Sequence, residues 1–472
     1  MQLYPLVLIG VLLMADGGLG FAAGVVLLDT AYVITAAIGG VLLLAGLAAG
    51  GVAWCRHRLD ARQQPSAVLA AQRIVHVTRW LLLVHFAVMV LVLGWLDTVR
   101  SATGDMVALD EVLAMGPTIA GFAATWWVFY PVERRVREAL LMRCLDEGSS
   151  FFPLPERGTW VLTQLRTHVF FLLVPILLIL VAVEAIEATA GMLADHAWTS
   201  PLADLGTMLA AAVIVIAAPL VSRFVLDAEP MPAGPLRDDL LGVCRRHGVR
   251  VRELLVWNTH GSMINAAVMG MVGWLRYVLL TDALLEAMTP RQVEAVMAHE
   301  IGHIRLSHLP WLLVSLLAAA SLVTVPLVGA RVLGAGAVSD ASVGGASMTV
   351  AVMAAAAVVF IIFGWVSRRF ERQADVFAVR HLDAHVDRNT TGLISAGAVA
   401  VVCDALGRIA LLNAVAAGRR SWRHGSIAWR QAYLRSIVGR SAAAMPIDRQ
   451  VRRIKVAAAV ILTLAAIVVI LG

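Results

Sequence analysis

His299-Glu300-Ile301-Gly302-His303 carries the strongest structural signal in the chain. It sets two imidazoles four residues apart, with a carboxylate beside the first. On an α-helix this spacing puts both histidines on one face, where they can bind one zinc ion while the glutamate lies over an activated water molecule. The alternative interpretation is a surface helix with two unrelated histidines.

The residues before this motif favour a helix. Thr289-Pro290 provides an N-cap followed by a proline in the first helical position. Apolar residues then recur at helical spacing, at Val293, Val296, Met297 and Ile301. We therefore expect a helix that runs through the whole motif.

The chain as a whole is strongly apolar. It is 60% hydrophobic, with a mean hydropathy of +0.81, which lies outside the range of soluble proteins. Several apolar runs approach the length that crosses a bilayer: 31–55, 80–96, 112–131, 168–183, 205–226, 310–333, 347–366 and 456–471. A further run, 5–28, is interrupted by Asp16 and several glycines, so it is either a span with a bundle-facing or snorkelling acid or a less regular segment. The fold class expected is a polytopic α-helical membrane protein with about nine transmembrane helices.

The loops indicate an orientation. Arginines concentrate in 56–79 and 134–166, whereas the loops 97–111 and 184–195 carry mainly acids. By the positive-inside rule, the arginine-rich loops and the N-terminus lie in the cytoplasm. The motif and residues 367–455 then face the cytoplasm too, and the C-terminus lies outside.

The net charge of the chain has a simple explanation in a membrane protein. Topology and contact with anionic lipid headgroups account for the net charge of +6. Because no nucleic-acid motif appears, we expect no nucleic-acid partner.

The scattered cysteines are Cys55, Cys144, Cys244 and Cys403. None forms a C-x-x-C pair, so we expect free thiols in a reducing compartment. Run 5–28 lacks the basic lead of a cleavable signal peptide.

The chain divides into parts at its composition changes. The expected parts are a multi-span membrane region (1–227), a unit with the zinc motif (228–309), a transmembrane hairpin (310–366), the completion of that unit (367–454) and a final transmembrane helix (455–472). A proline-rich linker opens the second part. It should then contain helices at 236–247 and 282–287 and strands at 249–257, 264–271 and 277–281. A small α+β unit therefore precedes the motif helix.

A third zinc ligand is expected beyond the hairpin. A catalytic zinc usually has three protein ligands, and the motif supplies two. Glu371 is the best third ligand, and Asp375, one turn later on the same helix face, can orient a ligand histidine through its other ring nitrogen. The hairpin 310–366 would return the chain to the same membrane face. The alternative is a pair of surface acids balanced by nearby arginines.

At these residues the chain resembles the integral-membrane zinc metalloproteases that include HtpX and the CAAX prenyl proteases, within the gluzincins. Residues 288–303 look like the family's active-site helix, and 367–375 resemble its S-R-x-x-E-x-x-A-D element. Asn265-Ala266 fits the family's N-A signature, which implies an edge strand at about 265–270 that pairs with substrate backbone. The resemblance covers about 234–308 and 365–434; the first half of the chain matches only in being membrane-embedded.

One element departs from the family pattern. Members commonly carry H-P followed by an arginine after the third ligand. Here His424-Gly425 lacks the proline, while Arg430 keeps the arginine. The resemblance implies that His424 or Arg430 stabilises the oxyanion together with zinc. The alternative is two basic residues in an arginine-rich loop near lipid.

The resemblance implies a small zincin-like metalloprotease domain at the cytoplasmic face, with one zinc ion held by His299, His303 and Glu371. Glu300 would act as the general base in peptide-bond hydrolysis. The expected partners are the lipid bilayer and a protein or peptide substrate, and the expected location is a bacterial inner membrane. The role would be protein quality control or peptide processing, which the sequence does not distinguish.

Two other functions stay open. A non-catalytic membrane scaffold or transporter would carry a vestigial zinc site, and the intact Glu300 argues against it. A zinc-dependent proteolytic sensor would need an outer ligand-binding domain, and the predicted outer loops are too short for one.

The remaining histidines are expected to lie outside the site. His308 is five residues after His303 and should point elsewhere on the helix. His381 and His385 should lie at the surface. His85 falls in a predicted span, where a histidine satisfied within the helix bundle is expected.

Overall fold

The computed structural model describes residues 4–16, 29–62, 64–104, 108–146, 155–192, 199–333, 341–386 and 391–471. They form two compact units. The first comprises Met1–Met231, Leu255–Met263 and Met269–Ala287; the second comprises Pro232–Leu254, Ile264–Val268 and Met288–Gly472. The zinc motif and its predicted partners Glu371, Asp375, His424 and Arg430 all belong to the second unit.

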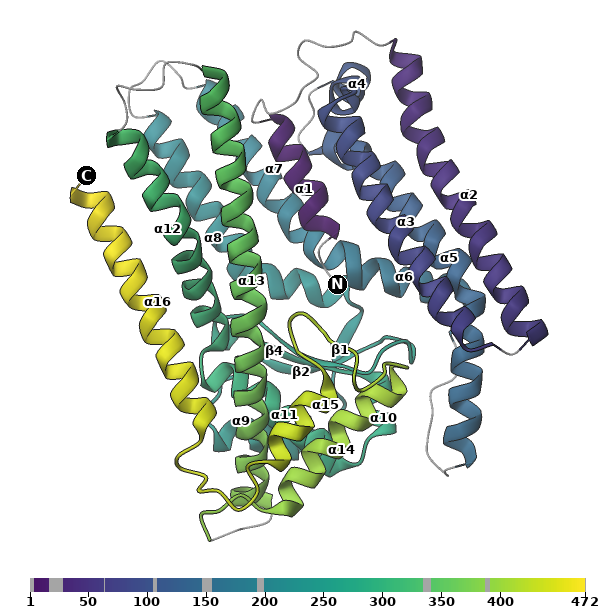
Figure 1. Cartoon of the computed structure of the whole chain (residues 1–472), viewed down its shortest axis with the longest axis vertical. Helices are drawn as coiled ribbons and strands as arrows, with labels where there is room; N and C mark the ends of the chain where they lie inside the picture. The colour runs from purple at the N-terminus through teal and green to yellow at the C-terminus, as the bar shows by residue number, and fades with distance from the viewer. Residues whose placement is uncertain are drawn as a thin grey trace. The chain divides into compact units, whose positions relative to one another are not determined.

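The first unit is mainly helical. Its helices are α1 (Tyr4–Met14), α2 (Thr30–Arg62), α3 (Ser66–Leu91), α4 (Trp95–Thr103), α5 (Leu109–Asp146), α6 (Arg157–Leu165), the π-helical turn η3 (Arg166–Phe170), α7 (Phe171–Met192), α8 (Thr199–Val225) and α10 (Asp282–Ala287). Helices α2, α3 and α5 pack together (Figure 1). Leu82, Phe86 and Phe122 fill their core. Their outer faces expose large apolar side chains such as Leu42 and Leu43, as expected of helices that face lipid.

Asp16 lies just beyond helix α1. The helix spans 11 residues, which is too short to cross a bilayer. Asp16 Oδ1 lies 2.8 Å from Arg100 Nη1, and Arg100 also pairs with Asp110 and Glu111. Asp16 therefore belongs to an ion-pair network at a helix end. The rest of the predicted run, 17–28, lies outside the described residues.

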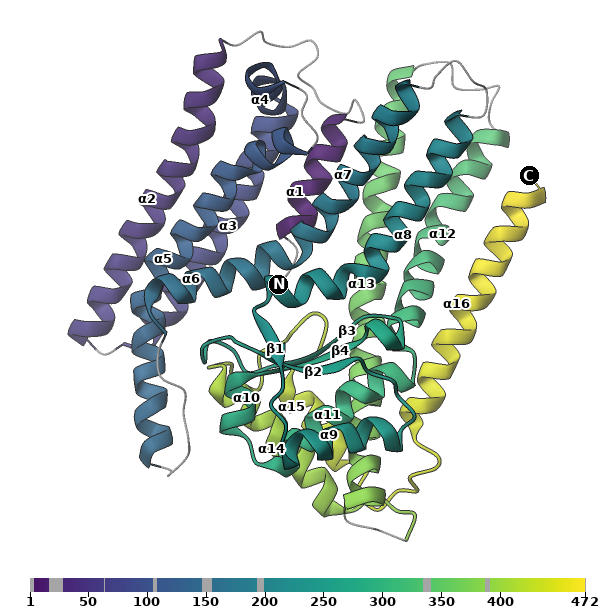
Figure 2. The ribbon, with the colours of Figure 1, turned by 180° about the vertical axis from the view of Figure 1, so that it is seen from behind.

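A four-stranded sheet runs in the order β1-β2-β4-β3 (Figure 2). Its strands are β1 (Ala228–Pro230), β2 (Glu253–Trp257), β3 (Ala266–Met269) and β4 (Tyr277–Thr281), and the 3₁₀ turn η4 (Gly273–Leu275) precedes β4. Strands β1 and β2 are antiparallel, with Ala228 opposite Trp257. Strand β3 lies at one edge, as predicted, and β4 and α10 have the predicted bounds.

The predicted strand at 249–257 is shorter than expected. Val249 N donates to Cys244 O at 2.9 Å, so Val249 still closes the end of helix α9 (Pro235–Arg246). Gly248, at φ 63°, turns the chain there. The alternating pattern begins in this helix cap, which is why β2 starts only at Glu253. Strand β3 is likewise shorter than 264–271 and is followed by Gly270, at φ 97°.

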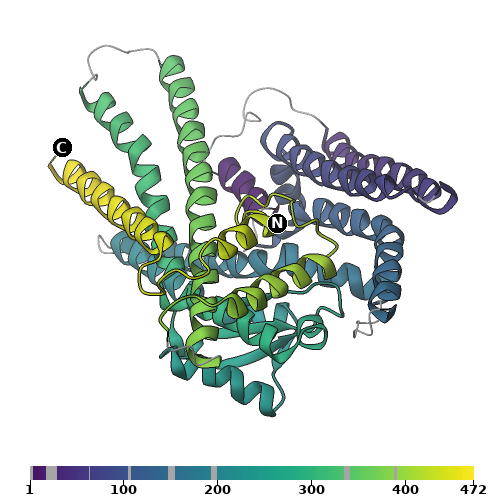
Figure 3. The same cartoon turned by 60° about the horizontal axis from the view of Figure 1, so that its bottom comes forward.

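The other helices of the second unit include the longest of those in the described residues. They are α11 (Pro290–Arg305), α12 (His308–Leu333), α13 (Ala341–His381), the π-helical turn η5 (Leu382–Val386), α14 (Ala396–Leu412), α15 (Ile427–Arg435) and α16 (Pro446–Leu471). Helices α12, α13 and α16, the last in yellow, pack on one another (Figure 3). Helix α13 is 41 residues long, so the returning span and the Glu371 element form one continuous helix.

Six helical segments among the described residues are long and apolar enough to cross a membrane. They are Thr30–Arg62, Ser66–Leu91, Leu109–Arg143, Arg157–Met192, Pro201–Val225 and His308–Pro326. On this basis the chain is an integral membrane protein. The runs 347–366 and 456–471 lie in α13 and α16 but are not among the six, so the number of about nine spans stays a prediction.

Candidate metal centre

Helix α11 begins where the sequence predicts. Thr289 is its N-cap, Pro290 its first residue, and Thr289 and Gln292 form a capping box. Gln292 N donates to Thr289 Oγ1 at 3.3 Å, and Thr289 N donates to Gln292 Oε1 at 3.1 Å. A cap of this kind stabilises a helix by about 1 kcal/mol. It fixes the start of the helix that carries His299 and His303 one turn apart.

A glycine within the motif lets helix α13 come close to α11. A Cβ atom at Gly302 would lie 3.1 Å from the ring of Phe377, so a larger residue would push the two helices apart. This close packing brings the buried carboxylates of Glu371 and Asp375 against the motif histidines. Gly302 therefore has a structural role inside the motif.

The three predicted ligands converge. The Nε2 atoms of His299 and His303 lie 3.2 Å apart. Glu371 Oε2 is 3.7 Å from Nε2 of His299, and its Oε1 is 3.7 Å from Nε2 of His303. Tetrahedral zinc with bonds near 2.1 Å separates its ligand atoms by about 3.4 Å. The spacing and the donor set of two nitrogens and one carboxylate therefore fit a zinc ion with an open position, and the group can hold a metal.

Arg430 holds both carboxylates of α13. Its Nε and Nη2 donate to Asp375 Oδ2 and Oδ1 at 2.8 and 2.5 Å, and its Nη1 lies 3.1 Å from Glu371 Oε2. Asp375 Oδ1 in turn lies 3.0 Å from His299 Nδ1. Arg430 is 8% exposed, and buried bidentate pairs of this kind are strong and directional. A single arginine thus fixes the acid that faces His299.

His424 reaches the site from a tight turn. Its Nδ1 lies 2.9 Å from Glu371 Oε1, and half of its side chain is exposed. Gly425 follows at φ 73°, and a Cβ there would lie 2.9 Å from the ring of Trp429. Glycine therefore makes the turn where the family pattern has proline.

His308 is not in the group of described residues that could together hold a metal, but the expectation that it points away from His303 is wrong. Its Nδ1 lies 2.9 Å from His303 Nδ1, and its Nε2 lies 3.0 Å from Gln373 Oε1. The prediction assumed one continuous helix. Instead α11 ends at Arg305, Ser307 adopts φ 54°, and α12 starts at His308. This break redirects the chain so that His308 packs beside His303.

Burial and neighbouring charges set the protonation of the site. Burial opposes charge on His299, yet Asp375 raises the pKa of His299 above its usual value. Burial and the charge of His299 hold the pKa of His303 well below its usual value. Burial raises the pKa of Glu300 to about 7. For Glu371, burial is outweighed by His424 and Arg430, and its pKa lies well below the usual value.

Asn265 and Ala266 lie at the start of the edge strand. Ala266 is the first residue of β3, and Asn265 immediately precedes it. The side chain of Asn413 ties this start to the end of α14, since Ile264 N donates to Asn413 Oδ1 at 3.0 Å and Asn413 Nδ2 donates to Ile264 O at 2.8 Å. Asn413 thus holds the residue before Asn265 in place, and the sequence patterns did not identify it. Pairing of this strand with a substrate stays a prediction.

The other histidines and the cysteines have mixed outcomes. His381 is buried, not at the surface, and its Nε2 lies 3.0 Å from Glu294 Oε1. The His385 side chain lies outside the described residues, and one ring nitrogen of His85 lies 3.3 Å from Ala36 O. Cysteines 55, 244 and 403 are free and buried, as expected. The side chain of Cys144 lies outside the described residues.

The segment that carries this centre, residues 240–444, matches the sequence model described as Peptidase family M48. No curated protein matches the chain. Among solved structures, the chain is similar to one titled "Crystal Structure of S. mikatae Ste24p". The sequence identity is 15%, the TM-score is 0.45, and the match covers 86% of this chain and 99% of that one.

Proposed function

We propose that the chain, whose residues 240–444 match the model of peptidase family M48, is a membrane metalloprotease that cleaves membrane-associated proteins or peptides with one zinc ion at the cytoplasmic face. The observation that carries this proposal is the convergence of His299, His303 and Glu371, whose ligand atoms all lie within 4.8 Å of one another. Glu300 sits beside the first of them in the same helix.

His299, His303 and Glu371 would hold the ion. When bound, zinc supplies a Lewis acid that polarises a carbonyl and lowers the pKa of water towards neutrality. Asp375 Oδ1 lies 3.0 Å from His299 Nδ1, so it would take the Nδ1 hydrogen and leave Nε2 to bind the ion. Arg430 keeps Asp375 in place for that task through two hydrogen bonds.

Glu300 is the proposed general base. Its carboxylate has no hydrogen-bond or ion-pair partner within the described part of the chain, so it is available to a water molecule. Burial raises its pKa to about 7, which suits proton transfer near neutral pH. Glu300 accepts a proton from the attacking water and then gives it to the leaving amine.

His424 is the better of the two proposed oxyanion stabilisers. All three guanidinium nitrogens of Arg430 already face Asp375 or Glu371, which supports a positioning role for that arginine. His424 is half exposed, so a substrate carbonyl can approach it. A developing negative charge at that point would be stabilised by an imidazolium or imidazole N–H.

The finer parts of the proposal concern the membrane and the substrate. We infer about nine spans with the N-terminus and the site in the cytoplasm of a bacterial inner membrane, which the arginine-rich loops support. Asn265 and Ala266 would pair with the substrate backbone, and the edge position of β3 supports this. The role proposed is quality control or processing of membrane-associated chains.

The test uses the full chain in detergent and an unfolded reporter protein. Cleavage should stop with a zinc chelator and return when zinc is added. A Glu300→Gln variant expressed in cells should retain uncleaved partners, and membrane-associated proteins should dominate those identified by mass spectrometry. Retention of soluble proteins alone would contradict the proposed substrate class, and chelator-resistant cleavage would contradict the proposed chemistry.

A non-catalytic scaffold and a proteolytic sensor are the alternatives. A scaffold needs no general base, yet Glu300, whose pKa is raised to about 7, lies beside the residues that could hold a metal. A scaffold would show no chelator-sensitive cleavage. A sensor would cleave only after an outer signal, whereas the protein proposed here cleaves the reporter constitutively.

A further inference from the structure

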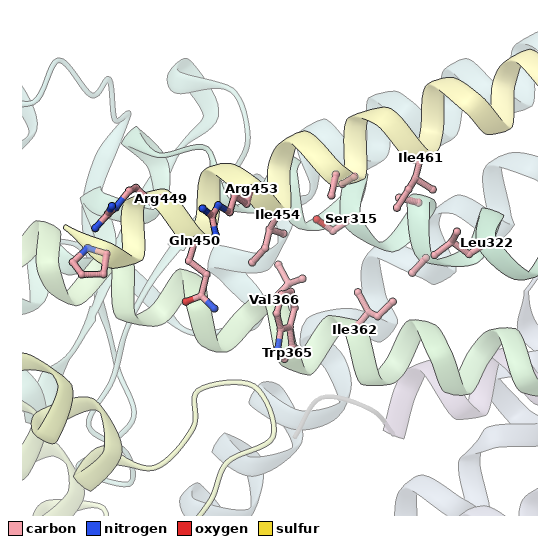
Figure 4. A pocket seen from close by; sticks show the side chains of 15 residues that line it. Ser315, Leu322, Ile362, Trp365, Val366, Arg449, Gln450, Arg453, Ile454 and Ile461 are labelled. Carbon is pink, nitrogen blue, oxygen red and sulfur yellow. The ribbon is translucent and has the colours of Figure 1, made fainter. Parts of the chain in front are cut away.

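A cavity of about 750 Å³ lies between α12, α13 and α16 in the second unit (Figure 4). Its volume falls within the roughly 300–1,000 Å³ that is typical of pockets for small ligands. None of the proposed zinc ligands lines it. It is therefore a separate feature that peptide hydrolysis does not explain.

The cavity changes character along its length. One end is apolar, with Leu322, Ile362 and Ile461 from the three helices; the other end has Arg449 and Arg453 from the first turns of α16 (Figure 4). The three apolar residues belong to the runs expected to lie in the bilayer, and both arginines precede the last of these runs. The cavity thus leads from hydrocarbon depth to the headgroup level.

The positive end carries uncompensated charge. Arg449 and Arg453 are exposed and have no acidic partner within the described ranges. The nearest acid in the sequence, Asp448, is already paired with Arg380 at 2.7 Å and accepts a hydrogen bond from Gln373 at 2.7 Å. Two guanidinium groups at one end of the cavity therefore favour an anionic ligand.

We propose that this cavity binds one anionic phospholipid, with its phosphate at Arg449 and Arg453 and an acyl chain along Leu322, Ile362 and Ile461. A free anion would leave the apolar wall without a partner, and an uncharged hydrocarbon would leave both arginines without a counterion. An anionic lipid supplies both chemistries in one molecule. Basic pockets between transmembrane helices bind anionic headgroups in this way.

The experiment is native mass spectrometry of the full chain released from detergent, with phosphatidylglycerol and phosphatidylcholine of identical acyl chains present in equal amounts. The wild type should retain one phosphatidylglycerol in preference to phosphatidylcholine. Arg453→Gln should lower that preference about fivefold, because one basic residue near an anionic lipid contributes roughly that factor. Arg452→Gln is the matched control, since Arg452 is exposed on the same helix but does not line the cavity; it should leave the preference unchanged.

Several results would overturn the proposal. They are equal retention of the two lipids by the wild type, an equal loss of preference in the two variants, and displacement of the lipid by millimolar inorganic phosphate, which would indicate a bare anion site. A dimer seen in place of the lipid adduct would assign the cavity to a second copy of the chain. Cleavage activity is not a readout, so failure of the proposed protease function would leave this test intact.

Discussion

His299 and His303, the two proposed zinc ligands of α11, have different partners at their Nδ1 atoms. His299 Nδ1 lies 3.0 Å from the carboxylate of Asp375. His303 Nδ1 lies 2.9 Å from another imidazole, that of His308. His299 therefore has a charged partner in direct contact, whereas the partner of His303 is a second histidine.

The contacts of His303 indicate which nitrogen of each imidazole carries the hydrogen. For Nε2 of His303 to bind a metal, its Nδ1 must carry the hydrogen and donate it to His308 Nδ1. Nε2 of His308 then donates to Gln373 Oε1, and Gln373 Nε2 donates to Asp448 Oδ1. His299 thus contacts the carboxylate of Asp375 directly, whereas His303 is linked to the carboxylate of Asp448 through the neutral side chains of His308 and Gln373. A direct carboxylate should make the stronger ligand, because charge-assisted hydrogen bonds are about twice as strong as neutral ones.

Loss of the Asp375 carboxylate should have the largest effect on zinc affinity. Asp375→Asn removes the charge that orients His299 and leaves Arg430 with one acid, so zinc affinity should fall by about 10–100-fold. Competition with a fluorescent chelator measures the affinity, and a melting curve of the metal-free protein checks folding. Asp404→Asn, an exposed acid on α14, is the matched control. An unchanged zinc affinity in Asp375→Asn would show that the carboxylate beside His299 does not strengthen this ligand.

Loss of the neutral partner should have a smaller effect. His308→Phe retains an aromatic ring to stack on Phe370, which lies at a centroid distance of 4.4 Å from His308, but it removes the hydrogen bonds to His303 and Gln373. Zinc affinity should fall less than about tenfold, the lower end of what loss of a ligand-orienting contact costs. The same competition assay measures it. A loss as large as that of Asp375→Asn would show that the two sides are equivalent.

The smallest expected effect is on the pH dependence of zinc binding. This dependence should change when the partner of His299 is altered but not when the partner of His303 is altered. Asp375 raises the pKa of His299, and a protonated imidazole cannot bind zinc, so wild-type affinity should decline as the pH falls through that raised value. In Asp375→Asn the pKa of His299 drops, and the decline should move to lower pH. His308→Phe should leave the midpoint in place. If the decline in zinc affinity moved to higher pH in Asp375→Asn, Asp375 would not raise the pKa of His299 as assigned here.

The sequence predicts the local parts of this centre. The N-cap at Thr289 and the helix from Pro290 follow from adjacent residues, and the structure confirms them. The bounds of β4 and α10 are confirmed for the same reason. Each of these features depends on side chains within one turn or one strand, so pattern and structure agree.

The sequence does not predict contacts that arise from a change in chain direction. His308 faces His303 only because Ser307 breaks the helix at φ 54°, and no helical pattern contains that break. Either His424 or Arg430 is expected at the substrate oxyanion. The three guanidinium nitrogens of Arg430 instead face Glu371 and Asp375, and Asp375 is 55 residues away in the sequence. The buried ring of His381 likewise contacts Glu294, which is 87 residues away in the sequence. These pairings come from packing between helices, which the periodicity of one segment does not encode.

The most direct test of the zinc centre measures bound zinc and cleavage on the same preparation of Glu300→Gln. Glu300 is not a ligand in this account, so the variant should retain about one zinc ion per chain. Loss of the general base should lower the cleavage rate by about 10²–10⁴-fold. Wild-type cleavage by the zinc-loaded variant would contradict the role of Glu300, and loss of zinc from the variant would contradict the ligand set of His299, His303 and Glu371.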